Sequence, residues 1–159
     1  MTPARIAERA RRLCAGIKAC EQGVAAIEFG FVAPILALAI IGTVDLGLGV
    51  YRSMQVHNAA QAGAQYALTH GFTASGVTTA TTSATSFTSI AATPAPVKFC
   101  GCPSISGVVT GSCTTACADG AQPGTYVRVS AQATYSPVIP WPMIPGSFAL
   151  SATSTVRVQ

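Results

Sequence analysis

The longest hydrophobic run in the chain lies between Phe29 and Tyr51. Its 23 residues carry one charge, that of Asp45, and twelve of them are Phe, Leu, Ile or Val. A helix of this length spans about 34 Å, enough for the hydrocarbon core of a bilayer. The twelve apolar side chains favour insertion by about 5 kcal/mol, whereas one off-centre aspartate opposes it by at most ~3 kcal/mol. The run therefore predicts a transmembrane helix.

Small and apolar residues continue at helical spacing beyond this run. They occupy positions 56, 59, 60, 63, 66 and 67, which lie on one face of an α-helix. Gly71 follows His70 and is typical of a C-terminal helix cap. We therefore expect one continuous helix over about 24–70, with its second half outside the lipid.

The segment 73–93 has a biased composition, because 17 of its 21 residues are Thr, Ser or Ala. Val77, Ala80, Ala84, Phe87 and Ala91 keep a helical spacing, which indicates a second helix. Threonine is a poor helix former, which favours a flexible linker instead. The sequence leaves both interpretations open.

Two later segments alternate between apolar and polar residues, as half-buried antiparallel strands do. They are Thr125–Tyr135 and Ser147–Val158. Four prolines lie in the eleven residues 136–146 between them, so the connection is expected to be a rigid loop rather than a tight turn. Residues 94–124 contain further prolines and cysteines and read as another loop.

The charges gather at the N-terminus. Residues 1–23 hold five of the nine basic residues and two of the five acidic ones, a net charge of +3. This tail reads as a solvated leader or as a basic amphipathic helix on a membrane surface. A positive flank before a transmembrane helix places the N-terminus in the cytoplasm and the residues beyond Arg52 outside. The rest of the chain has no basic patch with interleaved aromatics, which argues against binding of nucleic acid.

Four of the six cysteines lie in the segment expected outside the membrane, in an oxidising compartment. They are Cys100, Cys102, Cys113 and Cys117, whereas Cys14 and Cys20 lie in the tail. Their spacings fit the common zinc modules poorly. Disulfides that join the first pair to the second are favoured, because a bridge within Cys-Gly-Cys is strained. We expect no metal and no other cofactor.

Together these features predict an α+β protein. A long N-terminal transmembrane helix extends out of the membrane and precedes a small antiparallel β-sheet domain with a disulfide-rich loop. The expected divisions are a basic leader at 1–23, the helix at 24–70, a linker or second helix at 71–98, and the cysteine loop and sheet at 99–159.

A glycine and a glutamate mark the entrance to the apolar run. Cleavage after Gly23 would create an α-amino group on Val24, which ordinarily has a pKa of ~8. Glu28 lies at the mouth of the membrane segment, where an unpaired acid is costly. The amine of one chain and Glu28 of a neighbour offset that cost when they pair, and the pair fixes the axial stagger between helices.

This arrangement resembles type IV prepilins, and more narrowly the TadE-like family of tight-adherence (Flp-type) pilus systems. The residues that carry the resemblance are Ala25–Gly30, Ala33-Pro34, Val44–Gly47 and the small-residue segment 59–67, in which Gln65 replaces a basic residue. It covers about 23–68; the cysteine loop is no part of the family pattern.

The resemblance implies cleavage between Gly23 and Val24 by a prepilin peptidase and a place in assembly for Glu28 and Phe29. Pro34 is either a tolerated kink or an aid to leaving the bilayer. Asp45 is either a chain-to-chain contact or a hydrated acid near the outer surface. The implied partners are other pilin or pseudopilin subunits, the inner-membrane assembly platform and the lipid bilayer. The implied location is the inner membrane, with a single pass and a periplasmic C-terminal domain.

Other classes of function explain less of the sequence. An uncleaved single-pass anchor that displays a small ligand-binding or adhesive domain is the main alternative. A secreted domain released at Ala60–Ala62 conflicts with the long apolar run. An enzyme has little support, because His57, His70 and Asp119 form no recognisable catalytic or metal-binding spacing.

Overall fold

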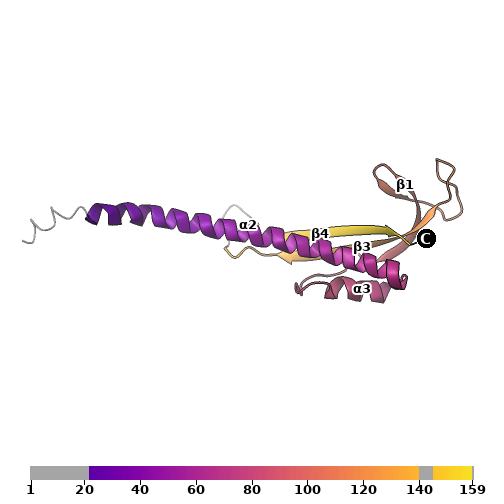
Figure 1. The fold of residues 1–159 in the computed structure, drawn as a ribbon, viewed down its shortest axis with the longest axis horizontal. Coiled ribbons are helices and arrows are strands. Elements are labelled where there is room, and N and C mark those ends of the chain that lie inside the picture. Colours follow the sequence, from indigo (N-terminus) through magenta and orange to yellow (C-terminus); the bar gives the residue numbers. More distant parts are fainter. Residues whose placement is uncertain (1–21, 140–144, 159) are drawn as a thin grey trace, which may run out of the picture. The chain divides into compact units, whose positions relative to one another are not determined.

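The computed structural model describes residues 22–139 and 145–158. The chain divides into two compact units, Met1–Val44 and Asp45–Gln159. Residues 1–21 of the predicted leader, with Cys14 and Cys20, lie outside the described residues, as do residues 140–144 of the proline-rich loop. Figure 1 shows the order of the elements.

A single helix, α2, runs from Gln22 to His70 over 49 residues. It continues through Pro34 and ends where Gly71 adopts a φ of 80°, a conformation that favours glycine. The long helix and its predicted end are therefore confirmed. Of the first unit, the structure describes only the part of α2 that precedes Asp45.

The second unit combines the rest of α2 with a short helix and a four-stranded antiparallel sheet (Figure 1). The elements are α3 (Ala74–Ser83), β1 (Val97–Ser104), β2 (Gly107–Thr110), β3 (Gly124–Tyr135) and β4 (Phe148–Arg157), and the strand order is β2-β1-β3-β4. Strands β3 and β4 coincide with the two predicted strands and pair without interruption from Tyr126↔Arg157 to Tyr135↔Phe148. The α+β class is confirmed, and the ambiguous segment 73–93 begins as a helix.

The core lies where one face of the sheet packs on α2 and α3. It forms two clusters: Val56, Ala59, Ala60, Ile90, Ala131, Ala133 and Ala152 in one, and Ala64, Ala67, Val77, Val127 and Val129 in the other. The helix supplies mostly alanines from its predicted stripe, and β3 supplies the alternate residues of its apolar face. These small side chains allow helix and sheet to approach closely, but they bury little area per residue.

The predicted loop over 94–124 is wrong for part of its length, because β1 and β2 form a hairpin there. Strand β1 pairs with β3 from Val97↔Arg128 to Gly101↔Gly124, and its far end pairs with β2. The two strands are short, and Gly101 and Pro103 interrupt the apolar alternation that identifies a strand from sequence.

Gly63 marks the closest approach of α2 to its neighbours. A Cβ at this position would collide with the Thr81 hydroxyl of α3 and lie 2.9 Å from Val129 Cγ1 of β3. We expect Gly63→Ala to destabilise the protein by about 1–3 kcal/mol through overpacking. Thermal unfolding in detergent, followed by circular dichroism, should show a Tm lower by roughly 5 °C.

Gly47→Ala is the matched control, because a Cβ at Gly47 meets nothing within 4 Å in the same helix. Alanine is the better helix former, so this variant should keep or slightly raise the Tm. Equal melting of the two variants would contradict the close packing at Gly63.

Candidate assembly and processing site

The N-terminal part of α2 is apolar on all sides. The exposed large side chains before Asp45 are Val24, Ile27, Phe29, Phe31, Val32, Ile35, Leu36, Leu38, Ile40 and Val44, with exposed fractions from 49% to 75%. A helix with no polar face lies either in a protein core or in a membrane. Among the described residues, α2 is the one helix long and apolar enough to cross a bilayer. None of the residues in its most apolar stretch is buried.

The residues of the predicted processing site lie at the start of this helix. Gln22, Gly23 and Val24 all belong to its first turn, and Val24 is 59% exposed. Glu28 lies one turn further along on the same side as Val24, with its side chain exposed. It is the one charged residue from 22 to 44. A single carboxylate therefore stands one turn from the predicted new N-terminus.

Pro34 lies inside the helix and is exposed. A proline has no N–H, so the carbonyl of Gly30 receives no helical hydrogen bond from it. Glycine at position 30 leaves the backbone uncovered, since a Cβ there would meet nothing within 4 Å. This turn therefore presents a backbone acceptor in an otherwise apolar surface.

Asp45, in contrast, is 7% exposed and is held by the sheet end of the second unit. The Tyr135 hydroxyl donates to Asp45 Oδ1 and also to the Asp45 backbone carbonyl at 3.0 Å. The Val138 N–H donates to the same carboxylate oxygen at 3.1 Å. The hydrogen bond to Asp45 raises the pKa of Tyr135 above its ordinary value of 10.0. The Tyr135 ring packs against Gly49: a Cβ at this position would lie 3.5 Å from Tyr135 Cε1.

Arg52 contacts two residues of the second unit. Its guanidinium donates to Gln55 Oε1 at 3.2 Å and lies 4.4 Å from the centre of the Phe87 ring. A cation over an aromatic face is stabilised by the ring quadrupole. The arginine therefore fastens the segment after α3 to the long helix.

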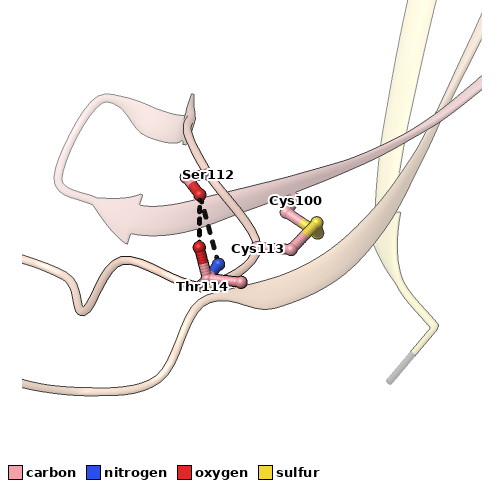
Figure 2. Close-up of a disulfide and its surroundings, with 4 residues drawn as sticks. All are labelled: Cys100, Ser112, Cys113 and Thr114. Atoms are coloured by element: carbon pink, nitrogen blue, oxygen red, sulfur yellow. Dashed lines mark hydrogen bonds between the residues drawn. A yellow bond between two sulfur atoms is a disulfide. The ribbon is translucent and has the colours of Figure 1, made fainter.

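Two disulfides join the hairpin to the loop that follows it. Cys100 pairs with Cys113 and Cys102 pairs with Cys117, which is the predicted linking of one cysteine pair to the other. Figure 2 shows the first bridge beside a small turn, in which the Thr114 N–H donates to Ser112 Oγ at 3.2 Å. Within the described ranges no group of three or more His, Cys, Asp or Glu side chains is placed to hold a metal ion.

The structure thus separates the predicted site residues into three places. Gly23, Val24, Glu28, Phe29 and Pro34 share the apolar start of α2, and the cysteines gather where disulfides join β1 to the loop after β2. Asp45 contacts Tyr135, a partner that the sequence does not reveal because 90 residues separate the two. The one available signal was an acid in an apolar run, which requires some partner.

In the part of the chain that the structure describes, these features define one helix of the length and composition of a single-pass membrane anchor, followed by a small disulfide-bonded α+β domain. Residues 23–65 match the family model described as TadE-like protein. The match confirms the predicted resemblance; it begins at Gly23 and includes Glu28, Phe29, Pro34 and Asp45. No curated protein and no solved structure matches the chain.

Proposed function

We propose that the chain is a minor pseudopilin of a tight-adherence (Flp-type) pilus or secretion system. The observation that carries this proposal is the TadE-like match over 23–65, which starts at the glycine of the predicted cleavage site. The exposed apolar helix supports a structural subunit that packs in lipid and against other helices.

Processing creates the assembly-competent end of the subunit. A prepilin peptidase cuts between Gly23 and Val24 and removes the basic leader. The new α-amino group then stands at the N-terminus of α2, in the same turn that presents Glu28. The leader holds the N-terminus in the cytoplasm until that step.

Assembly pairs the amine of one subunit with Glu28 of its neighbour. Val24 and Glu28 are four residues apart, which corresponds to an axial stagger of about 6 Å between adjacent helices. Each partner relieves the other of the cost of a lone charge in lipid. The neighbours are pilin or pseudopilin subunits, delivered through the inner-membrane assembly platform.

The exported domain faces an oxidising compartment in this proposal. Both disulfides lie after the anchor, and such bridges persist outside the cytoplasm. The subunit is therefore a single-pass protein of the inner membrane with its C-terminal domain in the periplasm.

The decisive experiment is the N-terminal residue and intact mass of the protein from native membranes. We expect a mature chain that begins at Val24, with or without a methyl group on its amine. A chain that begins at Met1 would overturn the processing step and favour the uncleaved anchor with a displayed domain. Gly23→Leu in the same cells is the control, and it should preserve the leader.

A further inference from the structure

We propose that Asp45 fixes the outer boundary of the lipid-embedded segment. It acts as a latch that seats the base of the exported domain on the membrane surface. The idea deepens the proposed function, because it defines how much of α2 is in the bilayer and which surface of the domain contacts lipid headgroups. It rests on the contacts of Asp45, which pilin processing does not use.

The first step is that protein, and not lipid, covers Asp45. Its carboxylate accepts hydrogen bonds from the Tyr135 hydroxyl and the Val138 N–H, and its exposed fraction is 7%. The helix next to it is shaped for this contact, because Gly49 lets the Tyr135 ring lie against the backbone. Lipid therefore cannot surround α2 at this turn.

The second step concerns the strand that delivers Tyr135. Strand β3 belongs to an open four-stranded sheet, and an open sheet cannot lie in hydrocarbon because its edge amides would have no hydrogen-bond partners. The end of β3 is therefore at or outside the membrane surface. Asp45, which it contacts, must be there too, so the lipid-embedded segment ends by Val44.

The third step is a comparison of lengths. The residues from Val24 through Val44 make a helix of about 31 Å, which equals the hydrocarbon thickness of a typical bilayer. The two compact units of the chain also divide between Val44 and Asp45. One bilayer thickness therefore separates the proposed new N-terminus from the latch. The proposed outer boundary at Asp45 therefore lies before Tyr51, the residue at which the hydrophobic run of the sequence ends.

The surface beside the latch has a lipid-compatible residue. Val138 is 67% exposed, although its backbone N–H is held against Asp45. An exposed apolar side chain at this depth meets the interfacial region of the bilayer. In this proposal the base of the domain rests on headgroups, while Tyr135 and Val138 of the domain donate hydrogen bonds to Asp45 Oδ1.

The test maps which helix positions react with a membrane-impermeant maleimide in spheroplasts. Cys14 and Cys20 are first replaced by serine, and the other assembly proteins are deleted so that no neighbouring subunit protects the helix. Single cysteines are then introduced by Leu38→Cys, Val50→Cys and Met54→Cys, at side chains that are exposed in the structure. Leu38 should be protected and Met54 labelled under either boundary, which makes them the controls.

Val50→Cys decides between the two boundaries. Labelling at a rate close to that of Met54→Cys supports a boundary at Asp45. Protection equal to that of Leu38→Cys would overturn it and return the outer boundary to Tyr51. Neither result depends on cleavage after Gly23, so failure of the latch and failure of the pilin proposal are distinguishable.

A second comparison tests the latch itself in the Val50→Cys background. Asp45→Leu removes the acceptor and adds an apolar side chain, so the helix should sink and labelling should slow by about tenfold. Asp45→Asn keeps an oxygen acceptor for Tyr135 and Val138 and should label as the parent does. Unchanged labelling in Asp45→Leu would show that Asp45 does not hold the boundary.

Discussion

Replacement of Glu28 by alanine is expected to leave insertion and processing intact but to remove the subunit from assemblies. Alanine makes the segment more apolar, so insertion is not impaired. In the proposed assembly, however, the Val24 amine of the neighbouring subunit loses its anionic partner inside the membrane. Because breaking a buried ion pair costs roughly 3–5 kcal/mol, incorporation should fall by about a hundredfold or more. Quantitative mass spectrometry of purified assemblies and of membranes measures the incorporated and the unincorporated subunits separately.

Three further variants show whether charge at this position is the cause. Glu28→Gln keeps the shape without the charge and should fail as alanine does, whereas Glu28→Asp keeps the charge and should retain part of the incorporation. Asp119→Ala removes an acid from an exposed turn of the domain, where Asp119 accepts a hydrogen bond from the Ala121 N–H. It should assemble normally. Normal incorporation of Glu28→Ala would remove the role assigned to this residue.

Loss of the disulfides is expected to give the largest change in the stability of the C-terminal domain. The bridges close segments with sequence separations of 13 and 15 residues. In the chain-entropy model each such bridge contributes about 3 kcal/mol. The core of alanines and valines offers little to compensate for that loss. Urea unfolding of Cys100→Ser/Cys113→Ser and of Cys102→Ser/Cys117→Ser, each in detergent, measures the two contributions separately.

The second bridge should matter more than the first, because Cys117 is buried and its N–H donates to the Ala121 carbonyl at 2.8 Å. Ser112→Ala is the control, since it changes only the small turn beside Cys113 shown in Figure 2 and should alter stability by no more than about 0.5 kcal/mol. If both serine pairs unfold at the urea concentration of the parent, the bridges do not stabilise the domain.

The parts of the fold that could be predicted are those with a local periodic signal. The α2 stripe from Val56 to Ala67 and the alternation in β3 and β4 each repeat over many residues, and each forms as expected. The end of α2 also has a local signal, because Gly71 takes a left-handed conformation that other residues avoid. Strand β2 has only four residues, too few for alternation to be recognised.

The remaining features depend on contacts between distant residues. Segment 73–93 could not be assigned from composition, and its helical start is supported by packing of Thr81 against Gly63. The Thr81 hydroxyl is satisfied locally, because it donates to the Val77 carbonyl at 2.8 Å. The choice between the two cross-linked cysteine pairings needed the three-dimensional course of the hairpin. Of the candidate site, Gly23 and Glu28 form a motif in the sequence, whereas the sequence around Asp45 indicates that the acid needs a partner but does not identify Tyr135.

The unbroken course of α2 has a mechanical consequence. Its apolar start and the alanines that it gives to the domain core belong to one helix, from Gln22 to His70. A pull on the apolar end is therefore transmitted along the helical backbone directly to the alanine contacts with β3. In the proposed membrane-anchored subunit, tension would have to shear that core before the domain could separate from its anchor.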